Sequence, residues 1–188
     1  MVEIRMAQGQ PDEMIVEGYA LVFDAPTVLF EAGGIAYKEV IKRNALNETN
    51  FKDCCLRYNH SDTVPILART RGGSLSLTID DKGLFFRAKL FDTQASRDVY
   101  SLVNGGALDK CSFAFIIDKN GDEYNAKTRT RTINSISKIL DCSIVDNPAY
   151  DQTSVNARSF FETQKELEDI AKQEQERLRH KLLIATYL

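Results

Sequence analysis

Short runs of apolar residues, interrupted every few positions by Gly, Asn or Asp, fill the chain as far as about residue 155. Runs of this length, alternating or continuously apolar, are typical of β-strands. The clearest of them cover residues 14–23, 74–79, 84–90, 109–117 and 133–145. The first 155 residues are therefore predicted to form a mainly β domain.

The turn Asp80-Asp81-Lys82-Gly83 separates two of these runs. Turn-forming residues between two short apolar runs are typical of a β-hairpin. Residues 74–90 are therefore expected to form a hairpin, and Gly83 is expected to supply the positive φ that closes it.

Two helices are expected within the β domain. Asp92 or Thr93 can cap a segment whose apolar residues recur at roughly helical spacing, and Asn104-Gly105-Gly106 can end it. The pattern also predicts a second, short helix from about Lys38 to Leu46.

The pattern changes at Asn156, where a segment without Gly or Pro begins that carries six basic and six acidic side chains. Its apolar residues recur seven, four, seven, four and three positions apart, as on one face of a long helix: Phe160, Leu167, Ala171, Leu178, Leu182 and Ala185. The chain is thus predicted to contain a domain at 1–155 and an amphipathic helical tail at 156–188. The tail is either a solvated terminal helix, packed on a neighbour or frayed, or a helix for docking or oligomerisation.

Composition and charge exclude several classes of function. The chain carries 24 basic and 27 acidic residues, and a net charge of −3 argues against nucleic-acid binding through a strong basic field. It lacks both the roughly 18 to 20 consecutive apolar residues of a membrane span and the apolar core of a signal peptide. No nucleic-acid or membrane partner is expected, and the protein is predicted to reside in a cytosol.

Several chemical signatures are also missing from the sequence. It contains no P-loop, no dinucleotide-binding glycine motif, no zincin motif and no nucleophile elbow. Its four cysteines include no C-x-x-C pair, and in a cytosol they are expected to be free thiols. Neither a cofactor nor a metal site is expected.

Polar residues stand at unusual places on two of the predicted strands. In the run 109–117, alternation puts Ser112 on the face opposite the apolar core residues, beside the small Ala114. In the run 139–145 it puts one set inside, namely Leu140, Cys142 and Ile144, and the other set on the opposite face, namely Asp141, Ser143 and Val145. A carboxylate in a buried run needs a partner. For Asp141 this partner is either Lys138, an arginine or an imidazole.

The chain has only two histidines to offer such an imidazole. His60 lies where an extended segment meets a polar loop that runs to Pro65. His180 lies among basic residues of the tail, where nothing holds it in a fixed geometry. Any mechanism that needs an imidazole is therefore predicted to use His60.

Together, Ser112, His60 and Asp141 supply a hydroxyl, an imidazole and a carboxylate, the parts of a serine nucleophile, its general base and the group that orients the base. Spacing alone leaves other interpretations open, because a strand serine and a strand-end histidine are commonly ordinary surface residues. A metal held by His60 and Asp62 would have too few ligands. A Cys111 nucleophile is disfavoured because alternation turns its thiol into the core.

Several short motifs, taken in their order along the chain, resemble those of a known protein family. They are Gly18-Tyr19-Ala20-Leu21-Val22-Phe23, Asn59-His60 followed by Pro65, Gly106-Ala107-Leu108 leading into Cys111-Ser112-Phe113-Ala114-Phe115, and Leu140-Asp141-Cys142-Ser143-Ile144-Val145 with Pro148-Ala149-Tyr150. In this order, over about residues 15 to 155, the set resembles the prohead (capsid maturation) proteases of tailed bacteriophages.

The resemblance implies a serine endopeptidase with a closed, mainly antiparallel β-barrel flanked by helices, similar to the herpesvirus assembly proteases. It implies His60 as general base and Ser112 as nucleophile. At the third position the family often carries Glu where this chain has Asp141, and Ala68 stands where a Gly is common. A shorter carboxylate must reach about one methylene further, and Asp62 is the alternative.

The resemblance also implies the substrates, namely the scaffolding protein or delta segment and the major capsid protein, together with self-cleavage. The expected location is the assembling procapsid in the host cytoplasm, and self-association is expected. The tail could package the enzyme with the scaffold. The oxyanion donors are expected to be backbone amides near Ser112, or else Arg129 or Arg131.

The alternative function is a non-catalytic, scaffold-binding assembly module on the same fold. Another acyl-transfer hydrolase, such as an esterase, is a further alternative.

Overall fold

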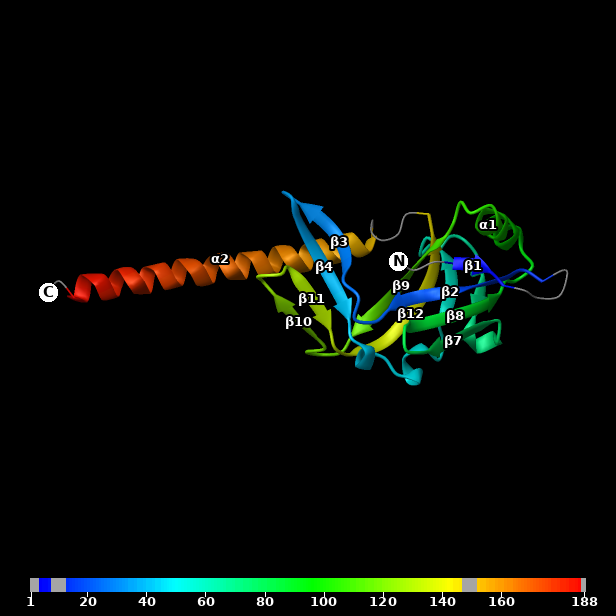
Figure 1. Cartoon of the computed structure of the whole chain (residues 1–188), viewed down its shortest axis with the longest axis horizontal. Helices are drawn as coiled ribbons and strands as arrows, with labels where there is room; N and C mark the ends of the chain where they lie inside the picture. Colours follow the sequence, from blue (N-terminus) through cyan, green and yellow to red (C-terminus); the bar gives the residue numbers. More distant parts are fainter. Residues whose placement is uncertain (1–3, 8–12, 147–151, 187–188) are drawn as a thin grey trace. The chain divides into compact units, whose positions relative to one another are not determined.

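The computed structural model describes residues 4–7, 13–146 and 152–186, without the side chains of 48–49, 152–159 and 181–186 (Figure 1). Within these ranges the chain is mostly β, with two α-helices. The chain divides into two compact units, Met1–Ala149 and Tyr150–Leu188, and each is described by itself.

The first sheet of the larger unit has the strand order β1-β2-β8-β7. All of its neighbouring strands are antiparallel. The strands are β1 (Ile4–Met6), β2 (Ile15–Val22), β7 (Leu75–Ile79) and β8 (Gly83–Lys89). The predicted hairpin at 74–90 is confirmed as β7 and β8.

The turn of that hairpin closes in a different way from the one predicted. Gly83 does not have a positive φ. Instead, one carboxylate oxygen of Asp80 accepts hydrogen bonds from the backbone N–H groups of Lys82 and Gly83, at 2.8 and 2.9 Å. A Cβ at Gly83 would lie only 2.0 Å from the Leu21 carbonyl oxygen, so glycine is needed here for the close approach of β2 to β8.

The second sheet has the order β10-β11-β4-β3, with β11 and β4 parallel. Its strands are β3 (Thr27–Ala32), β4 (Ile35–Ile41), β10 (Asp122–Asn125) and β11 (Thr130–Ile133). The predicted helix from Lys38 to Leu46 is wrong. Residues as far as Ile41 extend between two strand partners, and only a 3-10 turn, η1 (Arg43–Ala45), follows. Pairing on both sides of β4 outweighs its local helical spacing.

The third sheet has the order β6-β5-β12-β9 and carries Ser112 and Asp141, while His60 follows one of its strands. Its strands are β5 (Cys55–Tyr58), β6 (Ala68–Arg69), β9 (Lys110–Ile117) and β12 (Ile136–Val145). The run predicted at 133–145 is therefore divided between β11 and β12. In Figure 1, β12 is the long yellow strand that curves through the unit. It pairs in parallel with β5 and antiparallel with β9.

Helix α1 (Gln94–Asn104) confirms the helix predicted after residue 92. The Thr93 hydroxyl caps it by accepting a hydrogen bond from the Ser96 N–H at 3.1 Å, and Gly106 follows its end with a φ of 72°.

The described strands form three separate sheets, so the closed β-barrel that the resemblance implies is unconfirmed. Two further 3-10 turns are η2 (Glu48–Phe51) and η3 (Thr70–Gly72).

One hydrophobic core joins the sheets of the larger unit. Its fully buried side chains include Phe86, Leu56, Leu67, Leu84, Ile133 and Ile139. Each large apolar side chain buried in this way stabilises the fold by roughly 1.5–3 kcal/mol. The buried Asn50 side chain donates to the Ile136 and Ser137 carbonyls, at 2.7 and 3.1 Å, and so holds the start of β12 in place.

The smaller unit contains helix α2 (Gln152–Thr186), which begins four residues before the predicted tail. Pro148-Ala149-Tyr150, part of the motif set above, lies outside the described residues. Among the helices that the structure describes, none is both long and apolar enough to cross a membrane.

Candidate active site

An irregularity in β12 determines which of its residues are buried. The register with β9 shifts between Ile139 and Asp141, which pair with the consecutive residues Phe115 and Ala114. Leu140 is the extra residue of this bulge and is 43% exposed, so its predicted interior position is wrong. Beyond the bulge, Cys142 and Ile144 face the core, as predicted.

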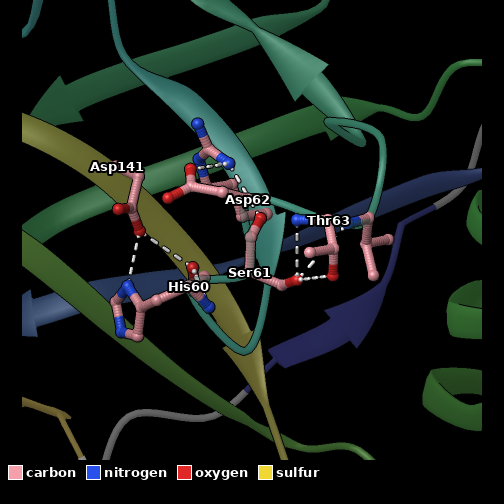
Figure 2. Close-up of polar contacts among 8 residues, drawn as sticks. His60, Ser61, Asp62, Thr63 and Asp141 are labelled. Atoms are coloured by element: carbon pink, nitrogen blue, oxygen red, sulfur yellow. Dashed lines mark hydrogen bonds and ion pairs between the residues drawn. The ribbon is translucent and has the colours of Figure 1, made fainter.

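Asp141 is a buried carboxylate with two partners. It is 9% exposed, and its Oδ1 atom lies 2.7 Å from Nδ1 of His60. The same oxygen accepts a hydrogen bond from the Ser143 hydroxyl at 2.8 Å. Figure 2 shows the His60 ring turned toward the Asp141 carboxylate. Of the partners considered from the sequence for this carboxylate, the structure thus places an imidazole beside it, and the shorter aspartate reaches the ring.

His60 follows β5 in a tight turn. Asn59 and His60 have φ values of 50° and 52°, and the Ser61 N–H donates to the Tyr58 carbonyl at 3.0 Å. Positive φ at both central residues is the requirement of a type I′ turn, and it reverses the chain direction at once. Asn59 further ties the turn to Asp146, since its side-chain NH₂ donates to that carboxylate at 3.0 Å.

Asp62, the alternative third residue, has a different partner. Its carboxylate lies 2.9 Å from Nη1 of Arg57 and is 90% exposed (Figure 2). The Arg57 guanidinium also donates to the Ser61 carbonyl at 2.8 Å. Arg57 and Asp62 therefore hold the loop, and the carboxylate that contacts the imidazole is that of Asp141.

Ser112 lies in β9, directly opposite Ser143 in the antiparallel pair. Directly paired residues point to the same face of a sheet, so Ser112 lies on the face that carries Ser143 and Asp141. Ser112 is partly exposed, whereas Cys111 beside it is buried. Burial raises the pKa of the Cys111 thiol to about 12, which keeps that thiol protonated and inert.

The free nitrogen of His60 is the remaining feature of the site. Its Nε2 atom is buried and has no hydrogen-bond partner among the described residues, so it is not bonded to Ser112 here. A carboxylate at Nδ1 favours the tautomer with the proton on Nδ1, which leaves a lone pair on Nε2. Base and nucleophile are often separated in an empty site and approach each other when substrate binds.

The other sequence candidates lie elsewhere. His180 is an exposed residue of α2, in the smaller unit. Arg129 and Arg131 belong to the turn and strand of the second sheet, where Arg129 donates to the Tyr124 hydroxyl and Arg131 to Asp122, at 3.0 and 2.7 Å. Within the described ranges, no group of three or more His, Cys, Asp or Glu side chains is placed to hold a metal ion.

Sequence alternation places Ser143 on the same face as Asp141 but assigns it no role. Its hydroxyl is fully buried and contacts both Asp141 and the backbone of His60. The signal that could have pointed to it is its position two residues after Asp141, on the same face of the same strand.

The site thus combines a partly buried histidine–carboxylate pair with a strand serine on the same sheet as Asp141, an arrangement typical of serine hydrolases. The family model described as caudovirus prohead serine protease matches residues 1–166 of the 188, and the chain belongs to this family. Comparison with curated proteins and with solved structures found no match.

Proposed function

We propose that the protein is a serine endopeptidase in which Ser112 is the nucleophile, His60 the general base and Asp141 the residue that orients the base. The observation that carries the proposal is the 2.7 Å contact between Asp141 Oδ1 and His60 Nδ1, which leaves Nε2 buried and unpartnered among the described residues. The register that puts Ser112 on the same sheet face supports it. Membership of a serine protease family supports the reaction class.

In the proposed mechanism, Nε2 of His60 takes the proton of the Ser112 hydroxyl as Oγ attacks a substrate carbonyl carbon. The Asp141 carboxylate accepts the Nδ1–H bond throughout and stabilises the imidazolium that forms. His60 then gives its proton to the leaving amine, and a water molecule hydrolyses the acyl-enzyme by the reverse sequence of proton transfers. Backbone amides near Ser112 are the proposed donors to the oxyanion.

We further propose the substrates and the place of action. These are the scaffolding protein or delta segment and the major capsid protein, cleaved inside the assembling procapsid in the host, with self-cleavage of the protease. The herpesvirus-protease-like barrel and self-association of the protease remain part of this proposal. Its basis is the prohead protease family to which the chain belongs.

The test is co-expression of the chain with its capsid and scaffold proteins, as wild type, Ser112→Ala and His60→Ala. Processing of both substrates is expected with the wild type and is expected to stop in each variant, because nucleophile and base act as a unit. Ser61→Ala is the matched control, since in the contacts described the hydroxyl of this turn serine bonds only to Thr63 and Val64 of the same loop. Unchanged processing by Ser112→Ala would end the nucleophile assignment.

A non-catalytic, scaffold-binding module is the alternative. It predicts that all three variants support capsid assembly to the same extent and that even the wild type leaves the substrates uncleaved. Cleavage that depends on Ser112 excludes it.

A further inference from the structure

Ser143 lies between the two residues that are proposed to form the catalytic histidine–carboxylate pair. Its side chain is fully buried at 0% exposure, in the strand that occupies an inner position of the third sheet. A hydroxyl buried in this way must use its hydrogen-bonding capacity, because water cannot compensate for a missing partner.

The hydroxyl makes two bonds, and each of them fixes a different member of the pair. Its proton is donated to Asp141 Oδ1 at 2.8 Å, on the oxygen that also contacts His60 Nδ1. Its oxygen accepts the backbone N–H of His60 at 3.2 Å. One side chain therefore sets the orientation of the carboxylate and the position of the residue that carries the imidazole.

The backbone of His60 needs such support. Its φ of 52° lies in the left-handed region, which residues with a Cβ rarely adopt and which costs energy unless the surroundings hold it. The bond from the His60 N–H to Ser143 ties this strained residue to β12 itself. The backbone of His60 and the carboxylate of Asp141 are thereby both fixed to β12.

We propose that Ser143 is a positioning residue of the protease: it holds the Asp141 carboxylate and the His60 turn in the geometry that keeps the Nδ1–H group of His60 directed at Asp141 and leaves Nε2 free for Ser112. This proposal deepens the proposed function and rests on it. It predicts that loss of the Ser143 hydroxyl slows the acylation of Ser112 without removing any group that touches the substrate.

The experiment compares Ser143→Thr with Ser143→Val in the full chain. The two side chains have nearly the same shape and share the added methyl group, so any packing cost is common to both, and only threonine keeps a hydroxyl. Ser143→Ala is included as the smaller change. Ser96→Ala is the matched control, because Ser96 is also 0% exposed and hydrogen-bonded but lies in α1.

The first readout is the rate at which a fluorophosphonate probe modifies Ser112, followed by mass spectrometry. In this reaction Ser112 Oγ bonds to phosphorus, the P–F bond breaks with loss of fluoride, and the hydroxyl proton passes to His60. We expect Ser143→Val and Ser143→Ala to slow it on the order of 10- to 100-fold, the effect of a small misplacement of catalytic groups. Ser143→Thr and Ser96→Ala should react at close to the wild-type rate.

The second readout is the low-field proton resonance of the His60 Nδ1–H group in protein labelled with ¹⁵N-histidine. The carbon-bound ring protons of exposed His180 provide an internal reference in the same sample. The resonance should persist in Ser143→Thr and in Ser96→Ala, and exchange-broaden or disappear in Ser143→Val.

These readouts separate the two levels of proposal. If the probe does not modify Ser112 in the wild type, the proposed function fails, whereas the His60 resonance still decides the role of Ser143. If the valine and threonine variants react at equal rates and show the same resonance, the positioning role is overturned while the protease assignment stands. If valine alone fails to fold while threonine remains active, the hydroxyl is needed for stability. The alanine variant then decides the positioning role, and a normal rate and resonance there would overturn it.

Discussion

The imidazole of His60 and the carboxylate of Asp141 lie 2.7 Å apart although 81 positions separate them in the chain. Two features of the backbone bring them together. The parallel pairing of β5 with β12 puts Cys55 opposite Asp141 and Tyr58 opposite Ile144. The two left-handed residues that follow then reverse the chain, so that the His60 side chain returns along β12.

This contact predicts a large loss of activity in Asp141→Asn. The amide keeps the shape of the side chain but no longer supplies a charged acceptor for Nδ1–H, so neither the tautomer nor the imidazolium is stabilised. We expect a fall on the order of 10³- to 10⁴-fold in the rate of substrate cleavage, the size seen when a triad aspartate is replaced in this way. The measurement is the time course of scaffold and capsid processing with purified enzyme.

Asp62→Asn is the matched control for this prediction, since Asp62 is exposed and paired with Arg57. It should cost no more than a few-fold in rate. Loss of activity in Asp62→Asn together with normal activity in Asp141→Asn would show that Asp62, and not Asp141, orients His60.

The sequence predicted a mainly β fold, the hairpin of β7 and β8, helix α1 and the faces of β9, because each depends on local periodicity or on turn and cap residues. It could not predict the contact of Asp141 with His60 without the resemblance, because that contact depends on which strands pair and in which register. Alternation failed at Leu140, where a bulge adds a residue to β12. It also gave no role to Ser143, whose function depends on a backbone group of another strand's turn.

The contact of Gly83 with β2 predicts a stability effect that is unrelated to turn conformation. In Gly83→Ala, the new Cβ would lie 2.0 Å from the Leu21 carbonyl oxygen, which is itself backbone and cannot move alone. Overpacking of this kind costs roughly 1–3 kcal/mol. Urea unfolding followed by circular dichroism should show a free energy of unfolding lower by about 1–3 kcal/mol.

Gly72→Ala provides the comparison, because a Cβ there has no atom within 4 Å and the residue does not have a positive φ. Its free energy of unfolding should stay within about 0.5 kcal/mol of the wild type. Equal effects of the two substitutions would show that the requirement at Gly83 is not steric.

Glu39 predicts a pH-dependent contribution to stability in the second sheet. Burial raises the pKa of its carboxyl from 4.5 to about 7, while Arg131, 3.8 Å away, lowers it and Asp122 raises it. Between about pH 4.5 and 7 the folded protein therefore holds a proton that the unfolded chain has lost, so the stability contributed at this site falls as pH rises. Above pH 7 both states are ionised and the loss is complete.

Glu39→Gln removes this titration, and the difference between variant and wild type measures it. The free energy of unfolding of the variant, relative to the wild type, should rise by on the order of 3 kcal/mol from pH 4.5 to pH 7.5 and then level off. Urea titrations at intervals of half a pH unit provide the measurement. A difference that is constant with pH, or that changes with the opposite sign, would contradict the raised pKa.

Helix α2 predicts a role for its apolar face in incorporation of the protease into procapsids. Leu167 and Leu178 lie eleven positions apart, close to three helical turns, and are 55% and 57% exposed. We expect the double variant Leu167→Gln/Leu178→Gln to lower the amount of protease in purified procapsids at least about fivefold, because docking through such a face depends on apolar burial. Asp169→Gln/Glu176→Gln changes exposed residues on the opposite side of the helix and should leave incorporation unchanged. Deletion of residues 160–188 should have the larger effect, and normal incorporation of that deletion would exclude the packaging role of the tail.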